Sequence, residues 1–114
     1  MQTIPAAQAA GPASDAGLAA RAAAGTQDAL IALMRRHNQL LYRTARSILK
    51  DDADAEDAVQ EAYLHAFRSI DAFRGEASLS TWLVRIVVNE SLARLRARRR
   101  RTEVIWLAGD AGGG

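Results

Sequence analysis

Apolar and small residues recur at intervals of three and four between residues 28 and 49. The members of this repeat are Leu30, Leu33, Met34, His37, Leu40, Leu41, Thr44, Ala45 and Ile48. Such spacing gathers them on one face of an α-helix and leaves most arginines of the segment on the other. Thr26 precedes the repeat and suits the N-cap position. The pattern therefore predicts an amphipathic helix over about 28–49.

A second helix, predicted over about 54–69, carries two separate stripes. Asp54 is its expected N-cap, with Asp57 three residues later. The stripe expected to be buried consists of Ala55, Ala58, Val59, Ala62, Ala66, Phe67 and Ile70. A different arc holds Asp57, Gln60, Glu61 and Leu64 at i, i+3, i+4, i+7 spacing. The first stripe packs and the second remains available to a partner, although an ordinary solvated face is the simpler alternative.

Residues 70–79 contain a glycine and no clear period, which indicates a loop. A third helix is predicted from about Thr81 to Arg98 or a little beyond, capped by Ser78 or Ser80. Its apolar face is formed by Trp82, Leu83, Ile86, Val87 and Leu92, and its polar residues include Arg85, Asn89 and Arg96. The β-branched run 86–88 would also suit a strand, but the three-four pattern around it favours helix. The expected fold is all-α, a compact bundle of three helices or four.

Both ends of the chain differ from this helical part. Residues 1–25 are rich in alanine and have few large apolar side chains, which predicts a disordered or weakly helical leader. Residues 104–114 end in glycines and read as the start of a linker and a flexible tail. The domain is therefore expected over 26–103.

Charge is sorted along the chain. Residues 51–61 hold six acids and no base, whereas residues 94–101 hold six arginines and no acid. This polarity predicts one surface for a basic partner and another for a polyanion. Cysteine is absent, so disulfides and thiolate metal sites are excluded. Without a signal peptide or a membrane-spanning run, a cytoplasmic location without membrane insertion is expected.

No catalytic group of residues emerges from the spacing. The sequence lacks a glycine-rich phosphate loop and a Ser/His/Asp pattern. Glu61 and His65 lie four residues apart, but two ligands on one helix do not make a metal site. His37 lies among apolar residues and is interpreted as structural. We expect neither enzymatic activity nor a cofactor.

Three motifs together indicate a family. They are DAEDAVQE at 54–61, Phe73-Arg74-Gly75 followed by TWLVRIVVN at 81–89, and Phe67 between them. At this spacing the chain resembles region 2 of the sigma-70 family, the promoter-specificity subunits of bacterial RNA polymerase, and within it the extracytoplasmic-function (ECF) class. The resemblance covers about residues 28–101.

The resemblance implies two binding surfaces. The second helix would dock on a coiled coil of the polymerase β′ subunit through Asp57, Gln60 and Glu61, with Leu64 adding apolar contact. The loop and third helix would recognise and melt the promoter −10 element, holding its non-template strand single-stranded. The residues implied in DNA binding are Phe73, Arg74, Gly75, Glu76, Ala77, Ser78, Arg85, Asn89 and Arg96.

Several alternatives remain open at this point. Phe73 could anchor the loop to the core, and Trp82 is interpreted as a core residue rather than a base-stacking one. The run 94–101 is expected to contact DNA phosphates or lead into a linker, with a solvated basic tail as the alternative.

Family members normally carry a second domain that reads the −35 element, and this chain is expected to lack it. Anti-sigma factors are further partners common in the family. The competing function is a sigma-like interaction module that binds polymerase or a regulator without reading promoters.

Overall fold

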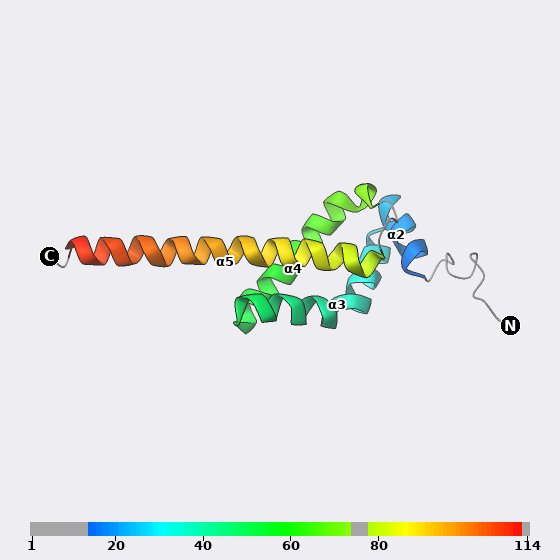
Figure 1. Ribbon diagram of the computed structural model, residues 1–114. Helices are drawn as coiled ribbons and strands as arrows, with labels where there is room; N and C mark the ends of the chain where they lie inside the picture. Colours follow the sequence, from blue (N-terminus) through cyan, green and yellow to red (C-terminus); the bar gives the residue numbers. More distant parts are fainter. Residues whose placement is uncertain (1–13, 74–77, 113–114) are drawn as a thin grey trace.

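The computed structural model describes residues 14–73 and 78–112, and every element within them is helical. The elements are α2 (Asp15–Ala23), α3 (Gln27–Leu49), α4 (Asp52–Ser69), the short 3₁₀ helix η1 (Ile70–Ala72) and α5 (Leu79–Gly112). α3, α4 and α5 pack against one another, and α2 packs mainly on α3. Figure 1 shows α2 at the end of the bundle where α3 and α5 begin and α4 ends. The predicted all-α class is confirmed.

The core is built from large side chains on two helices and small ones on the third. Leu33, Leu41 and Leu49 of α3 and Leu83 and Val87 of α5 are fully buried. The buried face of α4 consists of Ala55, Ala58, Val59, Ala62 and Ala66. Because alanine side chains are short, α3 and α5 can both approach α4 closely. Three members of the predicted apolar faces, Leu40, Phe67 and Leu92, are instead 45%, 38% and 38% exposed.

The turn between α3 and α4 corrects the predicted start of the second helix. Lys50 ends α3 in the left-handed conformation, with φ of 60°. Asp51, rather than Asp54, is the N-cap of α4, because its carboxylate accepts a 2.8 Å hydrogen bond from the backbone N–H of Asp54. Because Asp54 is not the cap, its carboxylate can accept a hydrogen bond from another part of the fold.

The N-terminal segment also differs from the sequence prediction. Residues 15–23, which the sequence predicts to belong to a disordered or weakly helical leader outside the domain, form α2, and Leu18, Ala19 and Ala22 of this helix are buried. The Oγ of Ser14 caps it by accepting a 3.0 Å bond from the N–H of Gly17. A helix with few large side chains can still pack when its alanines lie close to a neighbouring helix. The expectation for residues 1–13 lies outside the described residues.

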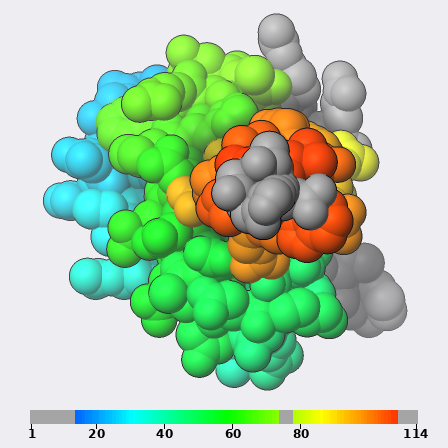
Figure 2. Space-filling view, turned by 90° about the vertical axis from the view of Figure 1, so that its left-hand side faces the viewer, coloured from blue at the N-terminus to red at the C-terminus, as the bar shows by residue number. Residues whose placement is uncertain are grey.

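α5 is much longer than predicted. It continues past Arg98 to Gly112, through the segment expected to begin a linker. Residues 99–108 contain no glycine or proline to end it, and arginine, alanine and leucine favour helix. Figure 1 shows this end of α5 extending beyond the other helices, and Figure 2 looks along α5 from it. Its apolar side chains are 57–70% exposed: Val104, Ile105, Trp106 and Leu107. Among the described residues, no helix is sufficiently long and apolar to cross a membrane.

Candidate functional site

The polar stripe predicted on α4 lies on the surface. Asp57, Gln60, Glu61 and Leu64 are all exposed, Leu64 to 49%. Within residues 14–73 and 78–112, none of their side chains takes part in a hydrogen bond or an ion pair. Two carboxylates and an amide next to an exposed leucine can therefore meet a basic partner without first breaking contacts inside the domain.

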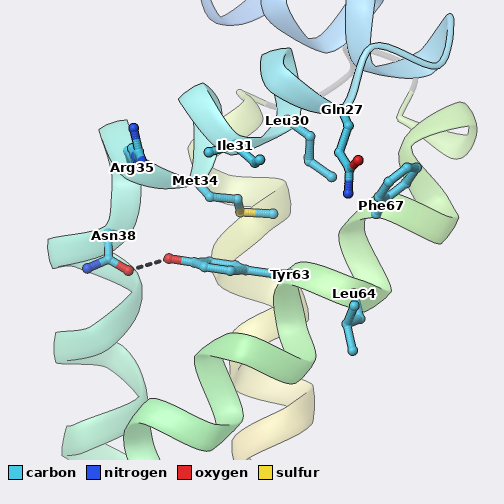
Figure 3. A pocket seen from close by; sticks show the side chains of 9 residues that line it. All are labelled: Gln27, Leu30, Ile31, Met34, Arg35, Asn38, Tyr63, Leu64 and Phe67. Atoms are coloured by element: carbon cyan, nitrogen blue, oxygen red, sulfur yellow. Dashed lines mark hydrogen bonds between the residues drawn. The ribbon is translucent and has the colours of Figure 1, made fainter.

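An apolar groove lies beside this stripe, between α3 and α4 (Figure 3). It has a volume of about 460 Å³. The hydroxyl of Tyr63 donates a hydrogen bond to the Oδ1 of Asn38 across it, and burial raises the pKa of that hydroxyl. The tyrosine thus remains a neutral donor at neutral pH. The lining side chains are Gln27, Leu30, Ile31, Met34, Arg35, Asn38, Tyr63, Leu64 and Phe67.

Sequence reasoning missed this groove. Phe67 was assigned to the buried face of the second helix, and Ile31 lay outside the apolar repeat. The available signal in the sequence is the apolar character of Ile31 and Phe67, which are 43% and 38% exposed in the structure. Exposed apolar side chains that gather at one place commonly mark a binding surface.

The segment before α5 is anchored by aromatic packing. The rings of Phe73 and Trp82 lie 5.4 Å apart between centroids, at 48° to each other, and both side chains pack against the core. Trp82 is therefore partly buried against the core, in line with its interpretation as a packing residue, and Phe73 holds the end of η1 to α5. Ser78 is exposed, and its Oγ accepts a bond from the N–H of Thr81, which makes it the N-cap of α5. The candidates Arg74, Gly75, Glu76 and Ala77 lie outside the described residues.

One face of α5 carries the remaining predicted DNA contacts. Arg85, Asn89 and Arg96 are exposed, and their spacings of four and seven residues place them in one row. Arg100 continues the row, and the half-exposed Leu92 lies within it. A helix rises about 1.5 Å per residue, so Arg85 and Arg96 are separated by about 16 Å along its axis. We call Arg85, Asn89, Arg96 and Arg100 the outer row of α5.

The opposite face of the same helix holds two arginines that bind the protein itself. Arg98 donates to the Oδ2 of Asp54 at 2.6 Å and to the carbonyl of Leu49 at 3.0 Å. Arg94 reaches the carbonyl of Asp57 at 3.4 Å. The run 94–101 is thus not a uniform phosphate-binding segment, because Arg94 and Arg98 join α5 to α3 and α4.

The described residues thus form a four-helix unit that presents an acidic stripe on α4 and a basic row on α5, and the side chains of both have no partner within residues 14–73 and 78–112. The sequence of residues 26–101 matches the family described as Sigma-70 region 2. The chain belongs to this family, the region 2 domains of RNA polymerase sigma factors.

Relatives place the chain near the ECF class of these factors. It is 48% identical over 83 residues to the ECF RNA polymerase sigma factor SigM of Mycobacterium tuberculosis, an alignment covering 73% of this chain and 42% of the relative. It is 37% identical over 89 residues to the ECF RNA polymerase sigma-E factor of Haemophilus influenzae, covering 77% and 46%. The chain thus spans less than half the length of these relatives.

A solved structure supports the same assignment. It is the NMR structure of an engineered region 2 of sigmaE in complex with GTAAAA. This neighbour superimposes with a TM-score of 0.72 at 34% sequence identity, covering 77% of this chain and 92% of the other. The helical arrangement described above is therefore the sigma region 2 fold.

Proposed function

We propose that this domain docks on core RNA polymerase and recognises and melts the promoter −10 element to start transcription. The observation that carries the proposal is the separation of two unpaired surfaces, the acidic stripe on α4 and the outer row of α5, on a sigma region 2 fold. Such a factor would act in the cytoplasm, on polymerase and the chromosome.

The polymerase surface is the stripe Asp57, Gln60, Glu61 and Leu64. A coiled coil of the β′ subunit that carries arginines would complement it, because carboxylates accept bidentate bonds from guanidinium groups. Charged pairs of this kind set the register and the rate of association, while Leu64 contributes apolar burial. The lack of internal partners for these side chains supports this assignment.

The DNA surface is proposed to comprise Phe73–Ser78 and the outer row. Asn89 can pair bidentately with a base edge, and Arg85 can bind guanine or a phosphate. Arg96, about 16 Å along the helix from Arg85, suits a backbone phosphate, which positions DNA without reading its sequence. The relative whose structure was solved with GTAAAA supports a single-stranded −10 strand as the ligand.

Melting the −10 element requires that the protein hold the unstacked bases. Unstacking costs a few kcal/mol per base, which stacking on side chains and polar contacts must offset. Phe73 is partly buried against Trp82, so it offers a base the remaining exposed part of its ring. The flanking residues 74–78 would supply the polar contacts of the pocket.

Fluorescence anisotropy with a labelled GTAAAA-containing single strand tests the DNA assignment. Arg85→Ala and Asn89→Ala should each weaken binding at least about fivefold, since a good base contact contributes about 1–3 kcal/mol. Arg43→Ala on α3, which also removes an exposed arginine, is the matched control. Equal affinity for scrambled DNA, even with core polymerase present, would reject promoter reading.

Pulldown of the β′ coiled coil tests the docking surface. The double variant Gln60→Ala with Glu61→Ala should abolish capture while the helical circular dichroism signal stays unchanged. The control is His65→Ala with Arg68→Ala, which alters two exposed residues on the same helix. Retained capture by the first variant would reject the assignment.

The apolar groove favours a second candidate, a sigma-like module bound by a regulator such as an anti-sigma factor. The groove shares Leu64 with the docking stripe, so a helix seated in it would compete with polymerase. Met34 and the aromatic rings there suit apolar side chains of varied shape. A domain with this function alone would still capture β′ or the regulator but would show no preference for −10 DNA.

A further inference from the structure

α2 lies against the segment that leads out of α4 toward the proposed DNA loop. Besides α3, it contacts η1 and α5 (Figure 1). A hollow of about 280 Å³ also lies between α2 and η1, beside this contact. The hollow is lined by Ala16, Ala19, Ala20 and Ala23 of α2 and by Ile70, Asp71 and Phe73. The alanine face of α2 thus faces the residue that opens the loop.

Two side chains attach this short helix to the domain. The carboxylate of Asp15 accepts a 3.0 Å bond from the Nη1 of Arg36 and lies 2.9 Å from the Nε2 of His37. Leu18 is the one large apolar residue of the helix, and it is 6% exposed. Because the other buried residues of α2 are alanines, which bury little area, its position depends strongly on Asp15 and Leu18.

The segment opposite α2 is the start of the proposed DNA loop. Ile70 is buried at 5% exposure, and the N–H of Phe73 donates to its carbonyl at 3.1 Å. Phe73 contacts Trp82 of α5 and also lines the hollow against α2. Its ring therefore packs on Trp82 of α5 and faces the alanines of α2 across the hollow.

We infer that α2 is a positioning element for DNA binding, and that Asp15 and Leu18 are the positioning residues that hold it. This inference rests on the proposed function. Ordering a loop costs conformational entropy, and a segment held in place before the ligand arrives binds more tightly. α2 packs mainly on α3, η1 and α5 rather than on α4, so loosening α2 should weaken DNA binding and leave polymerase docking unchanged.

The experiment uses the whole chain with the variants Asp15→Asn, Leu18→Ala and their combination. Anisotropy with GTAAAA-containing single-stranded DNA should show weaker binding, about two- to fivefold for Asp15→Asn, as expected of a partly exposed ion pair, and more for the double variant. Pulldown of the β′ coiled coil should match wild type. Arg21→Ala is the control, an exposed residue on the same helix.

A spectroscopic readout reports on the loop start directly. In a Trp106→Phe background, Trp82 is the sole tryptophan, and its emission should shift to longer wavelength when α2 loosens and water reaches the Phe73–Trp82 pair. Arg21→Ala should leave the emission unchanged. Asp15→Glu, which keeps the carboxylate, should restore much of the DNA affinity lost in Asp15→Asn.

The outcomes separate the two proposals. Wild-type preference for the −10 strand with unaltered affinity in the double variant overturns the inference and leaves the proposed function standing. No preference in wild type overturns both. If the double variant also loses β′ capture, the domain has unfolded. The test then rests on Asp15→Asn alone, which retains Leu18. Unchanged DNA affinity and unchanged Trp82 emission in that variant would reject a positioning role.

Discussion

Arg98 on α5 donates a 2.6 Å hydrogen bond to the carboxylate of Asp54 on α4. Its second terminal nitrogen donates to the carbonyl of Leu49 at 3.0 Å. That carbonyl belongs to the last turn of α3, where helix carbonyls lack partners within their own helix. One guanidinium therefore joins three helices at a single corner of the bundle.

Replacing Arg98 with alanine should lower the free energy of unfolding by about 1–2 kcal/mol, because a carbonyl and a carboxylate lose their donor together in a partly exposed place. Urea denaturation followed by circular dichroism measures this change. Arg96→Ala, two residues away on the outer row, should shift stability by less than about 0.5 kcal/mol. Equal stability losses in the two variants would show that the contacts of Arg98 stabilise the domain no more than an exposed arginine of the outer row does.

Asp52 should make part of the stability of the domain depend on acid pH. Hydrogen bonds from Arg46 at 2.7 Å and from Tyr42 at 3.0 Å lower the pKa of its carboxyl below the ordinary value of 3.8. A lowered folded-state pKa stabilises the protein above the ordinary value, and this stabilisation is lost as the pH falls from there through the folded value.

Asp52→Asn should therefore melt at a lower temperature than wild type at pH 7, and the two melting temperatures should converge as the pH falls below 3.8. Calorimetry across the acid range gives the comparison. Tyr42→Phe removes the weaker of the two donors. Its melting temperature should differ less from that of wild type, and this difference should depend on pH in the same way. A gap that persists unchanged at the acid end would contradict the role of the ionised carboxylate.

Lys50→Gly should stabilise the domain. Lys50 has φ of 60°, a conformation in which Cβ crowds the following carbonyl, and its N–H still donates to the carbonyl of Arg46 at 2.8 Å. Glycine removes the crowding but adds freedom to the unfolded chain, so the net gain should be about 0.5–1 kcal/mol. Lys50→Ala keeps Cβ and should give no such gain in chemical denaturation; a comparable gain would point to loss of the lysine charge instead.

Ser91→Ala should also stabilise the domain. The Ser91 side chain is fully buried in α5, and its Oγ finds no hydrogen-bond partner in the described part of the chain. Alanine removes the buried polar atom and favours helix, a gain of about 1 kcal/mol. Thermal unfolding tests this, with Ser91→Val as the overpacked comparison, which should lose stability. A destabilised alanine variant would reveal a partner for the hydroxyl.

The sequence predicts the helices better than their boundaries and mutual contacts. Periodicity placed Ala55, Ala58 and Ala62 on the buried face of α4, because a three-four repeat reports a helix face directly. It could not separate Asp51 from Asp54 as N-cap, since both are acids ahead of the same repeat. It also could not pair Arg98 with Asp54, which lie 44 residues apart.

For the candidate site, the same contrast holds. The exposure of Asp57, Gln60, Glu61 and Leu64 follows from spacing alone, and so does the row formed by Arg85, Asn89 and Arg96. Their roles in binding remain predictions. The sequence pattern does not predict the groove or the attachment of α2, because each depends on which helices become neighbours. The contact of Asp15 with Arg36 and His37 illustrates this.

The inward and outward arginines of α5 lie on opposite faces of one helix, at angles fixed by their spacing in the sequence. Each residue turns the helix by 100°, so inserting or deleting one residue between Asn89 and Arg94 would swing Arg98 away from Asp54 and carry Arg96 out of its row. Substitutions can alter one function at a time, whereas a change of length disturbs both together. The spacing of this segment is therefore more tightly constrained than the identity of most of its side chains.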